Sequence, residues 1–210
     1  MAASRPAAGG GRQVAVAPER LERWLAGFAQ RHGDLVRDGA SYRAADGARA
    51  ELEVPFPPLE GDPVAHALAP RRVGIVLVRL GGHAVGVAEG RRLVVSKVGS
   101  RQVHGRSAAG GWSQQRFARR REGQVRVAHA AAAQTAVDVL LPHADGLAGV
   151  VAGGERTSVE AVLADRRLAP LRELLTGRLL DVPDPRQKVL ETAPDLLREV
   201  WIRISDPVEA

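Results

Sequence analysis

The spacing of apolar residues predicts an amphipathic helix near the start of the chain. Four large apolar residues recur there at intervals of three and four: Leu21, Trp24, Leu25 and Phe28. This spacing places them on one face of an α-helix. Pro18 is typical of a first helical turn, and Gly33 is typical of the position after a helix ends. We therefore expect a helix over residues 18–32, preceded by a disordered tail over residues 1–13.

A predicted hairpin and a proline-rich connector follow this helix. Residues 41–54 contain Asp46-Gly47, a dipeptide that is typical of a two-residue hairpin turn. Five prolines come next: Pro55, Pro57, Pro58, Pro63 and Pro70. Because proline interrupts helical hydrogen bonding, we expect an extended connector without a helix. We place a domain boundary near residue 70, so that residues 14–70 form an N-terminal segment.

The clearest pattern in the chain predicts three consecutive antiparallel strands. Three β-rich apolar runs lie close together, at residues 73–80, 83–88 and 91–98. Gly81-Gly82 and Glu89-Gly90 separate these runs, and short links that contain glycine are typical of hairpins. The three runs therefore predict an antiparallel meander.

Helix and strand patterns alternate after the meander. Residues 113–141 have the pattern of a long helix that ends at Pro142, with an arginine-rich first half and an alanine-rich second half. Shorter runs predict strands at 147–152, 179–182 and 200–204, and helices at 158–164, 168–175 and 185–192. Together these elements predict an α/β domain over residues 71–206. Its mixed β-sheet would contain the antiparallel three-strand meander and would be flanked by helices.

The composition excludes several classes of chemistry. At 210 residues, the chain can form one full domain with a small attached subdomain. It has no cysteine, which excludes disulfides, thiolate metal sites and cysteine nucleophiles. No apolar stretch approaches the roughly 18 residues needed to cross a bilayer, so we expect a cytoplasmic protein without a membrane segment. The histidines and acidic residues show no metal-ligand spacing, and we expect no metal and no cofactor.

Positive charge is concentrated in one part of a chain whose net charge is +6. Between positions 97 and 126 the only acidic residue is Glu122, whereas eight residues are basic: Lys97, Arg101, Arg106, Arg116, Arg119, Arg120, Arg121 and Arg126. An arginine run at a helix start is often only a solvated face. Cations there oppose the helix dipole, however, so an anionic partner would be favourable. Clustered arginine points to the phosphates of a nucleic acid.

The segment between the third strand and the long helix combines glycine, glutamine and arginine. It has no carboxylate before Glu122, and its single histidine, His104, has no evident partner for acid–base catalysis. Glycines let the main chain approach a ligand closely, and arginines can bind phosphate in a fork geometry. His104 fits a structural or phosphate-contacting role better than that of a base. Two roles remain open for Trp112: stacking on a base or anchoring the loop.

Three short motifs in this segment carry a family resemblance. They are His104-Gly105-Arg106, Gly110-Gly111 and Arg116-Phe117-Ala118-Arg119. They resemble the loop and helix of the central domain of eukaryotic and archaeal class-one release factors, whose pattern is HGRGGQSALRFARLR. Residues 146–154 resemble the strand that follows in that domain. The resemblance covers about residues 70–205. It extends to the VLRF-type (Vms/ANKZF-like) release factors, in particular their actinobacterial branch.

The resemblance implies a fold, an activity and partners. The fold would be that of the release-factor central domain, which is RNase H-like. The activity would be hydrolysis of the ester bond of peptidyl-tRNA, which releases nascent chains from stalled large ribosomal subunits. The partners would be the rRNA of the large subunit and peptidyl-tRNA, with no membrane involved.

The resemblance also assigns roles to individual residues. The release-factor glutamine directly follows the Gly-Gly pair, but Trp112 occupies that position here. In VLRF-type proteins the glutamine is likewise displaced from the pair. The catalytic role therefore passes to Gln114 or Gln115, together with Gly110 and Gly111. Contacts with RNA would come from seven residues: His104, Arg106, Trp112, Arg116, Arg119, Arg120 and Arg121.

Two other functions are compatible with the sequence. One is a nuclease that cuts the tRNA acceptor end, an activity associated with relatives of this family. The absence of acidic metal ligands near the loop argues against a metal nuclease, but not against chemistry by a ribose hydroxyl. The other is a non-catalytic RNA-binding or ribosome-binding module. Trp112, in place of the family's glutamine, favours this last reading.

Overall fold

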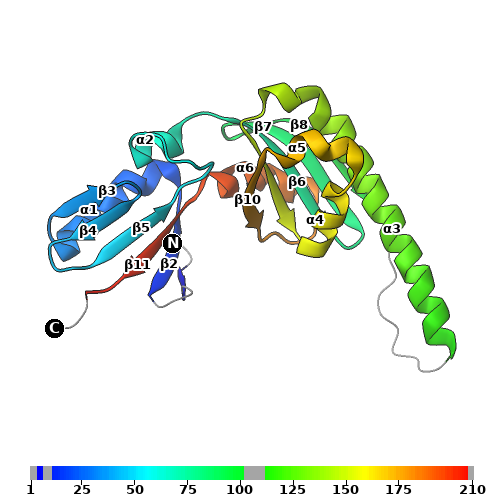
Figure 1. Cartoon of the computed structure of the whole chain (residues 1–210), viewed down its shortest axis with the longest axis horizontal. Coiled ribbons are helices and arrows are strands. Elements are labelled where there is room, and N and C mark those ends of the chain that lie inside the picture. Colours follow the sequence, from blue (N-terminus) through cyan, green and yellow to red (C-terminus); the bar gives the residue numbers. More distant parts are fainter. Residues whose placement is uncertain (1–3, 7–10, 102–111, 208–210) are drawn as a thin grey trace. The chain divides into compact units, whose positions relative to one another are not determined.

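The chain divides into two compact units (Figure 1). The computed structural model describes residues 4–6, 11–101 and 112–207, with backbone only for residues 4–6 and 112–118. Unit 1 comprises residues 1–70 and 195–210, and unit 2 comprises residues 71–194.

Unit 1 is built on an antiparallel sheet with the strand order β1-β2-β11-β5-β4-β3 among the described residues. The strands are β1 Ser4–Pro6, β2 Arg12–Val16, β3 Leu35–Asp38, β4 Ser41–Ala44, β5 Arg49–Glu53 and β11 Val200–Ser205. Strands β4 and β5 form the predicted hairpin. The predicted helix is also present, as the 3-10 turn η1, Pro18–Arg20, followed by α1, Leu21–His32. Leu21 and Phe28 of α1 are fully buried in the core that this sheet forms.

Two parts of unit 1 contradict the sequence prediction. Part of the expected disordered tail forms strands β1 and β2, and β2 pairs with β11 at five positions. The proline-rich connector, expected to lack a helix, contains α2, Pro63–Leu68. This helix forms because Pro63 occupies the first turn, where a missing N–H costs nothing. Asp62 then caps it by accepting hydrogen bonds from two backbone N–H groups.

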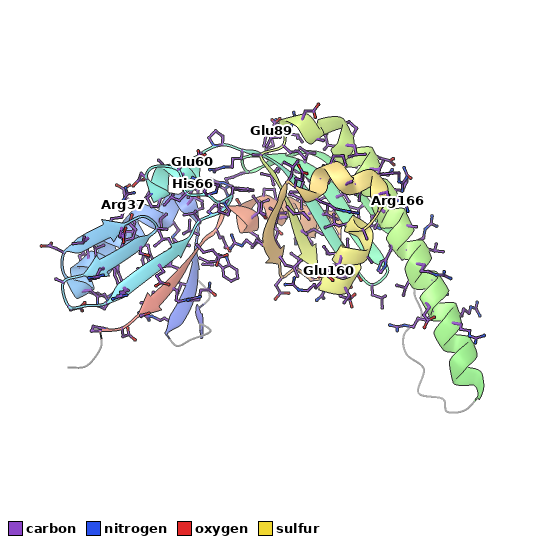
Figure 2. The ribbon with its side chains drawn as sticks, in the orientation of Figure 1. Arg37, Glu60, His66, Glu89, Glu160 and Arg166 are labelled. Carbon is purple, nitrogen blue, oxygen red and sulfur yellow. The ribbon has the colours of Figure 1, made fainter. Side chains whose placement is uncertain are left out.

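A buried histidine organises the connector around α2. Figure 2 labels His66 and Glu60 in this part of unit 1. The N–H of Glu60 donates to His66 Nδ1 at 3.1 Å. The Nε2 atom of His66 therefore carries the proton, and it donates to the carbonyl oxygen of Pro55 at 3.0 Å. Both ring nitrogens are satisfied, so His66 has a structural role.

The last strand belongs to unit 1, whereas the sequence prediction assigns residues 71–206 to one domain. Strand β11 lies between β2 and β5 and is antiparallel to both. Its alternating residues Val200, Ile202 and Ile204 are buried in the core of unit 1. Unit 2 therefore ends at residue 194. A local apolar pattern reveals a strand, but it does not reveal which distant strands will pair with it.

Unit 2 contains the mixed sheet that the sequence predicts, with the strand order β10-β9-β6-β7-β8 among its described residues. The strands are β6 Arg72–Arg79, β7 Gly82–Glu89, β8 Arg92–Ser100, β9 Gly149–Gly154 and β10 Leu175–Leu180. Strands β6, β7 and β8 form the antiparallel meander. Strands β9 and β10 extend the sheet from β6 in parallel. The predicted α/β class with a mixed sheet is confirmed.

Helices flank both faces of this sheet. Helix α3, Trp112–Leu140, packs on β7 and β8, and helix α4, Arg156–Leu163, shares its apolar core. Neighbouring residues of a strand point to opposite faces. Val85 faces the α3 core, so Gly86 faces the other side. There a Cβ on Gly86 would lie 3.3 Å from the side chain of Leu190 in helix α6, Gln187–Arg198.

The segment between α4 and β10 is less helical than the sequence predicts. A helix is expected over residues 168–175, but the structure has only η3, Arg166–Leu168, and α5, Ala169–Arg172. Strand β10 already begins at Leu175, because its residues pair in parallel with β9. The long helix α3 is followed directly by the 3-10 segment η2, Leu141–Gly146, which contains Pro142.

Candidate functional site

The two candidate catalytic glutamines lie in the first turn of helix α3. The helix begins at Trp112, and its backbone includes Gln114 and Gln115. The N–H groups of a first helical turn have no partner within the helix, and the positive end of the helix dipole lies there. The backbone positions of Gln114 and Gln115 therefore lie in the turn of α3 where main-chain donors face outward along the helix axis.

Four predicted site residues lie outside the described residues. They are His104, Arg106, Gly110 and Gly111, between the end of β8 and the start of α3. Their roles stay predictions. Trp112 and Arg116 are placed only as backbone positions of α3, within one and a half turns of its start.

The first half of α3 carries the arginine run and has no fully buried side chain among residues 119–126. Arg119 and Arg120 are exposed and Arg121 is half-buried. The first buried side chain in the described part of this helix is Ala128. Figure 1 shows the first half of α3 continuing past the sheet of unit 2. The change from an arginine-rich to an alanine-rich sequence therefore marks the place where the helix meets the sheet.

A groove lies between this half of the helix and the end of β8. Its volume is about 620 Å³. It is lined by Arg101, Arg120, Gly123, Gln124, Arg126, Val127 and Ala130. Most of these positions recur every three or four residues, so they lie on one face of α3. Arg101 faces them from the end of β8, where its N–H donates to the carbonyl oxygen of Gly81 at 2.7 Å.

A buried polar pair fixes the second half of α3 on the sheet. The hydroxyl of Thr135 donates to the carbonyl oxygen of Ala131 at 3.0 Å, so its oxygen accepts from His83 Nε2, also at 3.0 Å. His83 and Thr135 are both buried. Burial lowers the pKa of His83, and the positive charges of Lys97 and Arg101 lower it further. His83 is therefore neutral at physiological pH and acts as a fixed hydrogen-bond donor.

An exposed polar network also links α3 to its neighbours. Lys97 of β8 forms an ion pair with Asp138 at 2.9 Å, and Gln134 donates to the same carboxylate. Gln134 in turn accepts from Arg167, which pairs with Asp165 at 2.8 Å. Hydrogen bonds from Arg167 lower the pKa of Asp165 to about 2. Because these groups are exposed, the network orients the helix more than it stabilises it.

Neither a metal cluster nor a membrane helix is found in the described part of the chain. No group of three or more His, Asp or Glu side chains is arranged to hold a metal ion within residues 4–6, 11–101 and 112–207. In the same residues, no helix is both long and apolar enough to span a bilayer.

Only Arg120 of the seven lining residues was a predicted RNA contact, and the residues that were not predicted include Arg101, Gly123 and Arg126. The sequence contains a signal for two of them, because Gly123 and Arg126 fall on or beside the helix face that includes Arg120. Arg101 gives no such signal. It meets this face only because β8 ends beside α3.

Comparison with known proteins identifies the family. A family model described as the Actinobacteria/chloroflexi VLRF1 release factor matches residues 71–203, which is more than half of the chain. The chain therefore belongs to the VLRF1 release-factor family of actinobacteria and chloroflexi. This match confirms the resemblance deduced from the loop and helix motifs. It connects the protein with translation termination or ribosome rescue.

Two solved structures show more distant similarity. One is the crystal structure of an archaeal translation termination factor, aRF1, with 20% identity and a TM-score of 0.40. The match covers 57% of this chain and 32% of that one. The other is described as an archaeal protein, with 21% identity, a TM-score of 0.39, and coverage of 58% of this chain and 32% of that one. The match thus spans about a third of the length of each. No curated protein matches the chain significantly.

Proposed function

We propose that the protein hydrolyses the ester bond of peptidyl-tRNA on the large ribosomal subunit and so releases nascent chains from stalled subunits. The observation that carries this proposal is the position of Gln114 and Gln115 in the first turn of α3. Membership of a release-factor family supports it, and so does the arginine-rich first half of the same helix, where Arg119 and Arg120 are exposed.

In the proposed reaction, one water molecule attacks the carbonyl carbon of the ester. The bond between this carbon and the terminal ribose oxygen of the tRNA breaks, and the ribose oxygen takes up a proton. The products are a peptide with a free carboxyl group and a tRNA with a free hydroxyl group. A glutamine amide orients the water, and N–H groups at the start of α3 hydrogen-bond the charge that develops on the carbonyl oxygen.

The arginines hold the RNA in this proposal. Helix α3 rises about 1.5 Å per residue, so Arg119, Arg120 and Arg126 lie within about 18 Å of Gln114 along its axis. Phosphates bound there would orient an RNA end toward the start of the helix. Arginine suits this role because it stays charged and binds phosphate through several donors at once.

Only one of the two glutamines can serve a single reacting centre. Adjacent residues of an α-helix point about 100° apart, so Gln114 and Gln115 face different directions. We therefore expect one single substitution to abolish hydrolysis and the other to leave most of it. Gln114→Ala and Gln115→Ala, measured separately, identify the residue.

The test uses purified large subunits that carry radiolabelled peptidyl-tRNA, and the products are resolved on a gel. Release of peptide with intact tRNA is the expected result, and it should be lost in the Gln114→Ala, Gln115→Ala double variant while subunit binding is retained. A shortened tRNA would instead indicate a nuclease. Unchanged peptidyl-tRNA, with the protein bound, would indicate a non-catalytic module, as Trp112 in place of the family's glutamine would favour.

A further inference from the structure

The charges that line the groove beside α3 favour the binding of an anion. Its three charged lining residues, Arg101, Arg120 and Arg126, are all arginines and all exposed. None of the three forms an ion pair with a carboxylate in the part of the chain that the structure describes. Each guanidinium group can therefore offer its donors to an anionic ligand without first giving up a carboxylate of the described residues.

The floor of the groove is apolar and is formed by Gly123, Val127 and Ala130. Val127 is 59% exposed, which is unusual for a large aliphatic side chain next to a packed helix–sheet contact. Gly123 lies one turn before it, and a Cβ on Gly123 would meet no atom within 4 Å. Glycine in a helix costs about 1 kcal/mol relative to alanine. No contact among the described residues explains why glycine occupies this position. The missing side chain at Gly123 leaves the floor of the groove open.

We propose that this groove binds a single-stranded segment of RNA, with its phosphates on Arg101, Arg120 and Arg126. The bases and riboses would lie against Val127, Ala130 and the bare backbone of Gly123. Arg101 and Arg126 are thereby RNA-binding residues in addition to those that the family motif suggests. The choice of RNA as the anion rests on the proposed function, whereas the site itself rests on the geometry of the groove.

Shape and charge favour single-stranded RNA over other anions. Single-stranded nucleic acids bind in basic grooves that also offer surfaces to the bases. An acidic peptide would match the arginines, but it would have no large planar group to cover the apolar floor. The groove has a volume of about 620 Å³ and is widely open to solvent, so it offers room for an extended chain rather than a pocket for a lone ion.

The test measures binding of a fluorescein-labelled single-stranded RNA of about ten nucleotides to the full chain by fluorescence anisotropy. Arg101→Ala and Arg126→Ala should each weaken binding about tenfold at low salt. Each should also lower the slope of log affinity against log salt concentration by about 0.7, the effect of one lost phosphate contact. The matched control is Arg156→Ala, since Arg156 is exposed on α4 and does not line the groove. It should change neither quantity.

A second variant separates shape from charge. Gly123→Leu fills the floor without altering any charge and favours the helix, so the helix content measured by circular dichroism should not fall. Binding of the RNA should weaken while the salt slope stays as in the unaltered protein. If the salt slope fell together with the affinity, the substitution would have displaced the arginines rather than only filled the groove.

The proposal is overturned if Arg101→Ala and Arg126→Ala bind the RNA as Arg156→Ala does. It is also overturned if poly-glutamate of equal charge displaces the RNA as well as unlabelled RNA does. This binding assay contains no ester, so its failure is distinct from failure of the proposed hydrolysis. Loss of binding in the groove variants would stand even if no peptide were released, and peptide release would stand even if these variants bound normally.

Discussion

His83 shows how one residue can set the position of the candidate site. Its ring lies between strand β7 and helix α3, and it donates to the hydroxyl of Thr135. Gly99 is its cross-strand partner, and a Cβ there would lie 2.5 Å from the ring. Only glycine leaves room for the histidine at this point. Fixing Thr135 fixes the second half of α3, and the direction of its first half follows from the continuity of the helix.

Replacing Thr135 should therefore destabilise unit 2. Thr135→Val keeps the shape but leaves the buried N–H of His83 without an acceptor, which should cost about 1–3 kcal/mol. Urea denaturation followed by circular dichroism measures this change. Thr192→Val is the matched control, because Thr192 is exposed on α6 and its hydroxyl donates to a carbonyl oxygen of its own helix. An equal cost in both variants would contradict a special role for the buried pair.

The lowered pKa of His83 also predicts an acid-sensitive stability. The unfolded chain takes up a proton on this histidine below about pH 6.5, while the folded chain resists protonation because the pKa is lowered by burial. The free energy of unfolding should therefore fall as the pH drops below about 6.5, and level off only below the folded pKa. His83→Gln should show a shallower fall. Part of the slope should persist, because burial also lowers the pKa of His129. A slope identical in the two proteins would contradict this assignment.

At the scale of the element, the two halves of α3 differ in how they contact the rest of unit 2. The second half contributes Ala132, Ala136 and Leu140 to the core of unit 2. The first half has no fully buried side chain among those described, and it presents arginines and the groove. A helix segment without tertiary packing is held by its own hydrogen bonds and by continuity with the packed part.

Hydrogen exchange should therefore differ between the two halves of α3. Backbone amides at residues 119–127 should exchange faster than those at 132–140, because local opening costs less where no core contacts are lost. Mass spectrometry of the exchanged chain measures this difference. Adding the single-stranded RNA should slow exchange in the first half and leave the second half unchanged. Uniform protection along the helix would contradict the division.

At the scale of the whole molecule, strand β11, from the last part of the chain, pairs with strands from the first part. It lies between β2 and β5, and it contributes Val200, Ile202 and Ile204 to the core of unit 1. The unit formed by the first 70 residues is thus incomplete without residues 195–210. The region matched by the family model, 71–203, ends within this strand.

A chain that ends at Pro194 should consequently lose unit 1 but keep unit 2. Removing the strand between β2 and β5 leaves two unpaired edges and opens the apolar core. Hydrogen exchange should show loss of protection in β2 and β5, while β6 and β7 stay protected. Retained protection in β5 would show that unit 1 does not depend on β11.

Local patterns were sufficient to predict much of this molecule, and the exceptions share a cause. The meander, α1 and α3 were predictable because their apolar spacing and their turns lie within a short window. Strands β1 and β2, the place of β11 and the role of Arg101 were not, since each depends on a partner distant in the sequence. Helix α2 was missed because five prolines outweighed its cap, Asp62.

The candidate site was likewise predictable only in part. Gln114, Gln115 and the arginine run could be singled out because a family motif lies over them. The groove could not, since it requires the end of β8 to lie beside the exposed face of α3. A motif identifies residues that act together, whereas a groove arises only when separate elements meet.

The most direct test of the central claim is peptide release from large subunits that carry radiolabelled peptidyl-tRNA. The unaltered protein should release the peptide and leave the tRNA intact. The Gln114→Ala, Gln115→Ala double variant should bind the subunits equally well and release none. Release by the double variant at the unaltered rate would contradict the assignment of catalysis to the start of α3.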